Sequence, residues 1–271
     1  MSGSNDEEAL AGLKEALADS GFSVARHVVF PESDLPTAAE LTAAGLPLVA
    51  VFTGDGTLNA VLDTLAAWDG AVLVLPGGTM NLLSRRLHGD AAPADIIAAV
   101  AAGDARRRRP PVIACAAGHA YAGLLAGPGT AWSRVREAMR ESAVVDLAQH
   151  SVAAISDTLA APGVLVRQPV MGRTEGYPLI ELIAGDHGIE VLAFYAESAG
   201  DYLAQALALA RRNFREGPHE VLGQAMALTL AGSDGEPFGL LLDGEPADVG
   251  AAERFELVPC AVDLLATTGD G

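Results

Sequence analysis

The sequence contains only two cysteines, Cys115 and Cys260, among its 271 residues. Zinc sites and dithiol redox centres need cysteines, often with histidines, at short and regular spacings, and these two residues form no such spacing. A cysteine-based metal or redox centre is therefore excluded. Two buried free thiols are the favoured interpretation, and the sequence alone leaves a disulfide between them open.

Basic residues are also scarce. The chain has 17 Lys and Arg against 35 Asp and Glu, which gives a formal net charge of −18. General nucleic-acid binding and strong adsorption to anionic lipid both need a basic face. We therefore expect a cytoplasmic protein with no nucleic-acid partner. The polar and acidic start, MSGSNDEEAL, lacks the apolar centre of a signal peptide.

Long runs of strongly apolar residues are lacking as well, although half of the residues are hydrophobic and a sizeable core is expected. One long uncharged stretch, residues 110–132, follows four arginines. It consists mainly of Ala and Gly and contains His119 and the turn signal Gly127-Pro128-Gly129. A membrane span needs about 20 strongly apolar residues. We therefore interpret the stretch as two short buried strands joined by a turn.

The first hundred residues alternate between helix-like and strand-like patterns. The apolar spacing predicts helices over residues 7–21, 34–45, 57–68, 81–89 and 93–103, and strands over residues 22–30, 46–52 and 71–79. Continuous apolar runs such as LPLVAVF are typical of parallel strands that are buried on both faces. The sequence therefore predicts an α/β domain with a doubly wound parallel sheet over residues 1–107.

The remaining residues, 108–271, read as a β-rich second domain. Short apolar pieces are separated by turn signals, which is typical of an antiparallel sandwich. They cover residues 112–117, 119–126, 164–169, 178–185, 189–196, 225–232, 238–244, 254–259 and 261–267. Two helices are predicted within this domain, over residues 130–142 and 200–214.

The first candidate site is the loop TGDGT, residues 53–57, between a predicted buried strand and a predicted helix. Ligands of open α/β sheets bind at this edge, and glycines let the backbone approach a phosphate. Asp55 does not suit direct phosphate contact, because like charges repel, but it suits a Mg²⁺ ion or a hydroxyl proton. A plain strand-to-helix turn is the alternative.

A second glycine loop follows the next strand. LPGGTMNLL, residues 75–83, places Gly77 and Gly78 after a buried strand and Asn81 at the start of a helix. Two glycine loops at neighbouring strand ends form a wide site for several phosphates, so the pair favours a nucleotide site over two plain turns.

The segments TGDGTLNAVLDTL and LPGGTMNLLSRRL resemble the paired nucleotide loops of the diacylglycerol kinase catalytic-domain family. That family includes sphingosine kinases and bacterial lipid kinases, with NAD kinases and phosphofructokinases as distant relatives. The usual first loop is Gly-Gly-Asp-Gly-Thr; Thr53 replaces its first glycine, as a small hydroxyl residue does in sphingosine kinases. The form Pro-x-Gly-Thr-x-Asn of the second loop points to the lipid-kinase branch.

A third match lies in the segment SDGEPFGLLLDGEP, which contains two Asp-Gly-Glu-Pro copies. A hairpin turn accounts for the copy at Asp234, whereas the copy at Asp243 follows an apolar run as the family motif does. We assign the function to Asp243, although a turn also fits this copy. The resemblance makes Asp243 the candidate base for the lipid hydroxyl, with Glu245 orienting the acceptor or a metal-bound water. In sphingosine kinases the loop aspartate, here Asp55, is given the role of base.

The resemblance implies a first domain similar to those of NAD kinases and phosphofructokinases and a lipid-binding second domain, whose C-terminal end could pack back on the first. It implies an ATP- and Mg²⁺-dependent kinase that contacts a membrane surface transiently and phosphorylates the hydroxyl of a lipid such as diacylglycerol. The residues implied at the nucleotide are Thr53, Gly54, Asp55, Gly56, Thr57, Asn59, Gly77, Gly78, Thr79 and Asn81.

Two departures from the family keep alternatives open. The family begins with a strand and an Asn-Pro-x-x-Gly loop, of which Ser2-Gly3 would be the last remnant, so the first strand is interpreted as missing. Ala60 stands where the family has Glu. A catalytically impaired nucleotide- or lipid-binding protein is the main alternative. A kinase of a soluble acceptor, similar to NAD kinases, is another, which the Asp-Gly-Glu motif argues against.

Overall fold

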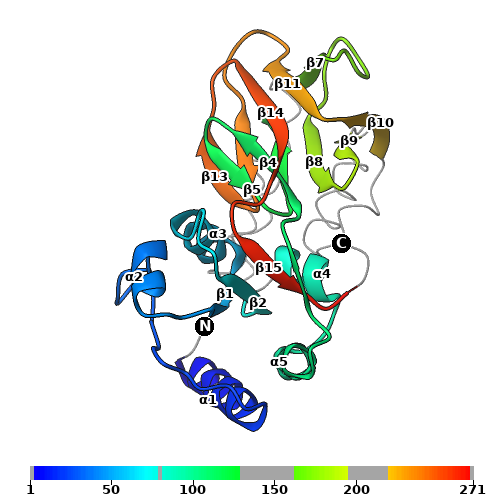
Figure 1. The fold of residues 1–271 in the computed structure, drawn as a ribbon. Helices are drawn as coiled ribbons and strands as arrows, with labels where there is room; N and C mark the ends of the chain where they lie inside the picture. Colours follow the sequence, from blue (N-terminus) through cyan, green and yellow to red (C-terminus); the bar gives the residue numbers. More distant parts are fainter. Residues whose placement is uncertain (1–2, 79–80, 129–161, 195–218, 269–271) are drawn as a thin grey trace. The chain divides into compact units, whose positions relative to one another are not determined.

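The computed structural model describes residues 3–78, 81–128, 162–194 and 219–268, drawn in colour in Figure 1. The chain divides into two compact units. The first combines Met1–Pro110 with Pro259–Gly271, and the second is Pro111–Val258. The helices predicted over residues 130–142 and 200–214 lie outside the described residues.

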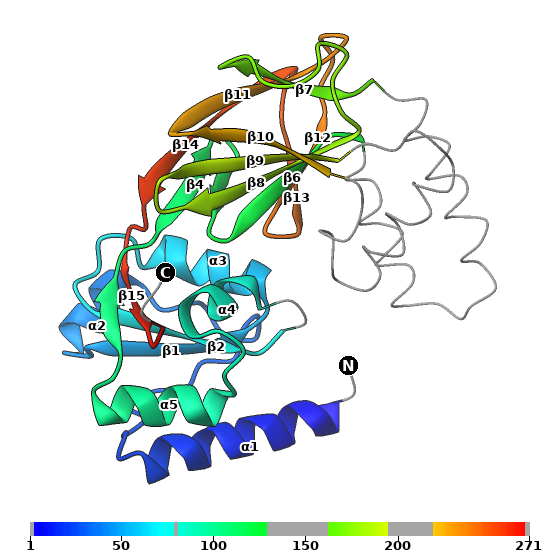
Figure 2. The ribbon, with the colours of Figure 1, turned by 90° about the vertical axis from the view of Figure 1, so that its right-hand side faces the viewer.

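The first unit is built on a four-stranded sheet in the order β1-β2-β15-β3. Its strands are β1 (Leu48–Thr53), β2 (Ala71–Pro76), β15 (Asp263–Ala266) and β3 (Arg106–Arg108). Its helices are α1 (Gly3–Asp19), α2 (Ala38–Ala43), α3 (Asp55–Thr64), α4 (Leu82–His88) and α5 (Pro93–Ala102). Figure 2 shows α3 and α4 on one face of this sheet and α1 and α5 on the other. Helices on both faces of a mainly parallel sheet confirm the predicted α/β architecture.

Burial on both faces explains why the strand runs were recognisable. All of β2 from Ala71 to Leu75 is buried. Leu73 and Leu75 pack in one cluster with Ile96 and Ile97 of α5, and α1 contributes half-buried apolar residues to the same cluster. Because residues 71–75 are buried on both faces of the sheet, the strand shows a continuous apolar run without alternation.

One predicted strand is wrong. Residues 22–30 form no strand, although their apolar and β-branched residues suit one. Val24 is 52% exposed and Phe30 is 47% exposed, so these side chains do not pack into the sheet core. An apolar pattern fits a strand only where a neighbouring strand accepts its backbone hydrogen bonds, and β1 is instead an edge of the described sheet.

The strand β15 comes from the end of the chain and lies between β2 and β3. It pairs parallel to β2 through Asp263↔Ala71 and Leu264↔Val72, and antiparallel to β3. The arginine run forms β3 itself. Asp263 forms ion pairs with Arg107, at 3.2 Å, and with Arg109, at 2.7 Å. These two arginines therefore meet a carboxylate of their own unit.

The described residues of the second unit form a six-stranded and a five-stranded sheet. The six-stranded order is β10-β9-β8-β6-β12-β13, and the five-stranded order is β5-β4-β14-β11-β7. The bounds are β4 (Pro111–Cys115), β5 (Gly118–Ala120), β6 (Gly123–Ala126), β7 (Val164–Gln168), β8 (Leu179–Gly185), β9 (Gly188–Phe194), β10 (His219–Ala225), β11 (Ala227–Gly232), β12 (Gly239–Leu242), β13 (Glu245–Asp248) and β14 (Ala252–Pro259). Strand pairing is antiparallel, as in β8–β9 and β11–β14.

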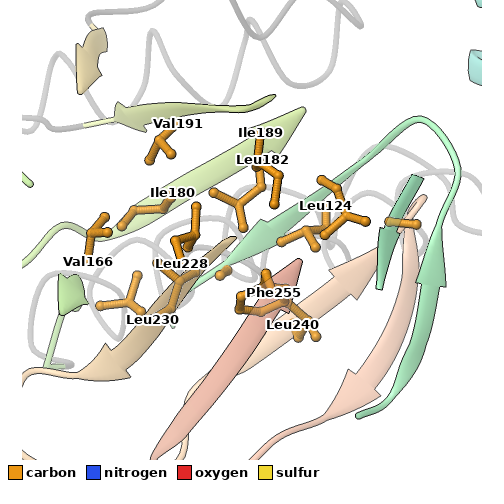
Figure 3. Packing of buried hydrophobic residues seen from close by; sticks show 14 of the residues in the cluster. Leu124, Val166, Ile180, Leu182, Ile189, Val191, Leu228, Leu230, Leu240 and Phe255 are labelled. Carbon is orange, nitrogen blue, oxygen red and sulfur yellow. The ribbon is translucent and has the colours of Figure 1, made fainter. Parts of the chain in front are cut away.

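The core of this unit lies between the two sheets. Figure 3 shows side chains of both sheets in one apolar cluster. Ile180 and Val191 come from the six-stranded sheet, and Leu228 and Phe255 from the five-stranded sheet; all four are at most 1% exposed. The antiparallel sandwich that the sequence predicts is thus confirmed.

The uncharged stretch at residues 110–132 contains three strands, β4, β5 and β6, over residues 111–126. Among the described residues, no helix combines the length and the apolar character that a bilayer crossing requires. Both cysteines are free thiols, as expected. Cys260 is buried, but Cys115 is only half-buried, because it ends β4 beside a tight turn.

Candidate active site

The first glycine loop, residues 53–57, joins the carboxyl end of β1 to α3. Gly54 has extended backbone angles and caps the amino end of α3, whose first residue is Asp55. The Thr53 hydroxyl donates a 2.8 Å hydrogen bond to the Gly54 carbonyl. Thr57 and Asn59 follow in the first turns of α3 and are half-buried. The loop therefore lies where open α/β sheets bind ligands.

The second glycine loop, residues 77–81, joins β2 to α4. Asn81 adopts the left-handed conformation, with φ +51°, and precedes the first residue of α4. Its side-chain oxygen accepts a 2.7 Å bond from the Gly78 N–H, and its amide nitrogen donates to the Gly78 carbonyl at 2.9 Å. Asn81 thus fixes the shape of this loop. Thr79 lies outside the described residues.

The two glycine loops touch backbone to backbone. A Cβ atom added to Gly78 would lie 2.6 Å from the Gly54 Cα atom. A Cβ atom added to Gly77 would lie 2.6 Å from the Thr53 backbone nitrogen. Distances this short exclude any side chain, so the contact itself requires glycine at both positions. The glycines therefore allow one loop to pack on the other, and they also leave the loop backbone accessible to a ligand.

A carboxylate also links the two loops. The Asp55 Oδ1 atom accepts a 3.0 Å hydrogen bond from the backbone N–H of Leu82, the first residue of α4. Asp55 is half-buried. The structure therefore brings together Gly54, Asp55, Gly77, Gly78 and Asn81.

The helix α4 carries two buried polar side chains, Ser84 and His88, one turn apart. The Ser84 hydroxyl donates to the Val74 carbonyl of β2 at 3.5 Å. The His88 Nδ1 atom lies 3.0 Å from the Thr267 hydroxyl. Burial lowers the pKa of His88 to about 4, so the imidazole is neutral at pH 7. The buried, neutral imidazole therefore has a structural role.

The acidic copy at Asp243 forms the turn of the β12–β13 hairpin. Leu242 pairs with Glu245, and the two residues between them, Asp243 and Gly244, have φ of +48° and +94°. Two residues with positive φ are typical of the tight turn that suits the twist of a hairpin. The turn alternative therefore describes the backbone here. It does not settle what the side chains do.

The Asp243 side chain is only 7% exposed and faces the link between β5 and β6. Its Oδ2 atom accepts from the Tyr121 N–H at 2.7 Å, and its Oδ1 atom accepts from the N–H groups of Ala122 and Gly123, each at 2.9 Å. The Asp243 N–H donates back to the Gly123 carbonyl at 3.0 Å. Charge-assisted bonds of this kind are strong, so Asp243 holds residues 121–123 in place.

The other two acidic groups of interest are differently placed. Glu245 begins β13 and is exposed. Asp234, in the first Asp-Gly-Glu-Pro copy, is also exposed, and its Oδ1 atom accepts a 3.0 Å bond from the nearby Glu236 N–H. Both copies thus form turns, but Asp243 is buried against another segment and Asp234 is not.

The candidate residues belong to two units, each described by itself. The glycine loops and Asp55 belong to the first unit, and Asp243 and Glu245 belong to the second. That Asp243 faces residues 53–57 stays a prediction. Among the described residues, no group of three or more His, Cys, Asp or Glu side chains is arranged to hold a metal ion.

Comparison with known families decides the assignment of the first unit. Residues 1–109 match the family model described as the diacylglycerol kinase catalytic domain. Over these residues the chain is similar to the members of that family. The resemblance carried by the two glycine loops is thereby confirmed, and the family supports a kinase of the lipid-kinase type. No curated protein matches the sequence.

Solved structures agree on the fold of the whole chain. A diacylglycerol kinase from Bacillus anthracis strain Sterne is 13% identical, with a TM-score of 0.58, and the match covers 93% of this chain and 88% of that one. A second diacylglycerol kinase-like protein from the same strain is 16% identical, with a TM-score of 0.58, and the match covers 95% of this chain and 90% of that one. At these identities the likeness shows the two-domain fold of diacylglycerol kinase-like proteins.

The groups that sequence reasoning missed are mostly backbone N–H groups. The donors to Asp55 and Asp243 are the amides of Leu82 and of residues 121–123. Every residue other than proline carries such a donor, so the residue letters give no signal for it. Only the loop position of Asp55, one strand away from the second glycine loop, hinted at a partner there.

Proposed function

We propose that the protein is an ATP- and Mg²⁺-dependent lipid kinase that transfers the γ-phosphoryl group to the hydroxyl of a lipid alcohol such as diacylglycerol. The family of residues 1–109 supports a lipid kinase in general. The choice of ATP, Mg²⁺ and a diacylglycerol-like acceptor is our proposal. We also propose that the protein is cytoplasmic and contacts the membrane surface transiently to reach its acceptor.

The contact between the two glycine loops is the observation that carries the proposal. Because no side chain fits at Gly77 or Gly78, the second loop has no Cβ atoms there to keep an approaching phosphate chain away from its backbone. We assign the nucleotide phosphates to these loops, with Thr57 and Asn59 of α3 and Thr79 as further polar contacts.

Asp55 suits a magnesium ion better than a phosphate. Mg²⁺ is commonly held by one or two carboxylates together with substrate phosphates, so a site with one protein carboxylate fits it. When bound, the ion neutralises charge on the phosphates. Asp55 is held on one side by the Leu82 N–H, which orients its carboxylate from the first residue of α4.

The acidic hairpin of the second unit supplies the acceptor chemistry in this proposal. The lipid hydroxyl oxygen forms a bond to the γ-phosphorus, the bond from that phosphorus to the β-phosphate oxygen breaks, and ADP leaves. The hydroxyl proton passes to a carboxylate. Glu245 is exposed, whereas three backbone N–H groups hold Asp243. We therefore assign proton transfer to Glu245 and hairpin support to Asp243.

Phosphate transfer from labelled ATP is the direct test. Purified full-length protein with Mg²⁺ is expected to label one of three lipid alcohols in mixed vesicles, namely diacylglycerol, a sphingoid base or a polyprenol. Asp55→Asn is expected to lower this rate at least about a hundredfold, because it removes the carboxylate charge that would hold Mg²⁺ beside the phosphates. Asp63→Asn, an exposed change on the same helix, is the matched control and should keep the rate.

Two outcomes would overturn the proposal. ATP binding by calorimetry without turnover on any lipid would favour a binding protein that has lost catalysis. Labelling of a soluble acceptor such as NAD, with none of the lipids, would favour a kinase of the NAD kinase type.

A further inference from the structure

The residues that follow β15 are bonded to the end of α4. The backbone N–H groups of Thr267 and Thr268 donate to the Leu87 carbonyl at 3.0 and 3.2 Å, and the Thr268 hydroxyl donates to the same oxygen at 3.0 Å. Leu87 is in the last turn of α4, where helix carbonyls have no partner within the helix. The chain segment after β15 therefore caps α4 from outside.

A second bond reinforces this cap. The Thr267 hydroxyl lies 3.0 Å from the Nδ1 atom of His88, the last residue of α4. His88 is buried at 4% exposure and Thr267 is half-buried, so the imidazole side of this contact is shielded from water. Hydrogen bonds to a buried polar side chain are costly to lose, because water cannot replace the partner. The orientation of α4 about its axis is thereby constrained as well as its end.

The opposite end of α4 meets the nucleotide loops. Its first residue, Leu82, donates its N–H to the Asp55 carboxylate at 3.0 Å, and Asn81 before it shapes the second glycine loop. The helix has only seven residues, so a shift or tilt at Leu87 moves Leu82 as well. Both ends of one short rigid element are thus tied, one to the end of the chain and one to Asp55.

We propose that Thr267 and Thr268 are positioning residues for the nucleotide site, acting through α4 on the Leu82–Asp55 hydrogen bond. The inference rests on the proposed function, since it presumes that Asp55 and the glycine loops act on a nucleotide. Neither threonine contacts the glycine loops directly in the bonds described above. Their effect is to fix where α4 presents Leu82 and Asn81.

The test replaces both hydroxyls while keeping side-chain shape. Thr267→Val with Thr268→Val removes the two side-chain bonds and leaves the backbone N–H bonds to Leu87. We expect the KM for ATP to rise about tenfold, the free-energy equivalent of one or two lost hydrogen bonds, with the KM for the lipid unchanged. Thr267→Ser with Thr268→Ser restores the hydroxyls and should restore the ATP KM.

A second readout does not need activity. The Leu82 amide is expected to exchange with solvent about tenfold faster in the double valine variant, because its bond to Asp55 is loosened. The Leu58 amide, which donates to Gly54 at 3.1 Å within α3, should keep its rate. Thr42→Val is the matched control, since the Thr42 hydroxyl bonds only within α2 among its described contacts, to Ala38 at 2.8 Å. It should change neither readout.

The outcomes separate the two proposals. A folded double variant with wild-type Leu82 exchange and wild-type ATP affinity by calorimetry would overturn the positioning of α4. A wild-type protein that phosphorylates no lipid would overturn the proposed function alone, because Leu82 exchange would still decide the coupling. A lowered melting temperature with an unchanged ATP KM below that temperature would mean a purely structural cap, which also overturns the inference.

Discussion

Asp55 in the first unit and Asp243 in the second are both carboxylates that accept hydrogen bonds from the backbone of another segment. Asp55 accepts from Leu82 and is half-buried beside two glycine loops. Asp243 accepts from three successive N–H groups, those of residues 121–123, and is 7% exposed. The same chemistry therefore serves a different purpose in each unit.

The role of an aspartate in a sequence motif is therefore better inferred from its hydrogen-bond donors and its burial than from the motif alone. One half-buried carboxylate tied to a loop is oriented and still lies at the surface of the phosphate site that we propose. A buried carboxylate with three donors stabilises the segment that supplies those donors. Substitutions at the two positions should accordingly separate into effects on activity and effects on stability.

The largest expected effect comes from breaking the contact between the glycine loops. In Gly78→Ala the new methyl would lie 2.6 Å from the Gly54 Cα atom, so the loops must separate. Lipid phosphorylation should fall about a hundredfold or more, since small displacements of a positioned site cost that much. Gly12→Ala on α1, where a Cβ meets nothing within 4 Å, is the control and should keep full activity. Near-wild-type activity in Gly78→Ala would contradict the claim that the contact between the loops positions the phosphate site of the first unit.

The second effect tests Asp243 against Glu245. Asp243→Asn keeps a residue that tolerates the left-handed backbone but turns an acceptor oxygen into a donor facing an N–H group. The free energy of unfolding of the second unit should fall by about 2 kcal/mol. Faster amide exchange at residues 121–123 would report the loosened loop. Glu245→Gln should instead lower the phosphorylation rate and leave the melting temperature unchanged.

The chain provides matched controls for this pair in its other Asp-Gly-Glu-Pro copy. Asp234→Asn and Glu236→Gln make the same chemical changes at exposed turn positions. Both should leave stability and activity near wild type. If Asp234→Asn destabilises the unit as much as Asp243→Asn does, burial and the three donors are not what distinguishes the copies.

The last prediction is a pH dependence of the stability of the first unit. Burial lowers the pKa of His88 to about 4, below the ordinary value of 6.5 that applies to the unfolded chain. The unfolded state then binds more protons, so stability is lost as the pH falls from about 6.5 towards 4, by at most about 3 kcal/mol. Amide exchange of β2 and α4 at pH 7 and pH 5 measures this loss. It should shrink in His88→Gln and persist in His27→Gln, an exposed control.

Much of the architecture follows from the sequence because parallel strands buried on both faces leave continuous apolar runs. The runs at residues 46–52 and 71–79 became β1 and β2, and the rule that ligands bind at strand carboxyl ends located both glycine loops. The register by which Gly78 meets Gly54 could not be predicted, since it depends on how the two loops fold back on each other.

Other features escaped because they depend on partners far along the chain. Residues 22–30 have the composition of a strand, yet pairing decides whether a strand forms. The run at residues 261–267 reads locally as one more strand of the sandwich. Only the family resemblance suggested that the C-terminal end could pack back on the first domain, and no local pattern gives β2 as the partner of β15. The arginine run at residues 106–109 likewise gave no sign that Asp263 would form ion pairs with two of its members.

The position of β15 has a consequence for synthesis on the ribosome. The gap between β2 and β3 is filled by residues 263–266, which emerge only after all of Pro111–Val258 has been made. Until then, one edge of β2 and one edge of β3 have unpaired backbone groups, and such open edges invite association with other chains. The sheet of the first unit therefore stays incomplete until the whole second unit has been translated.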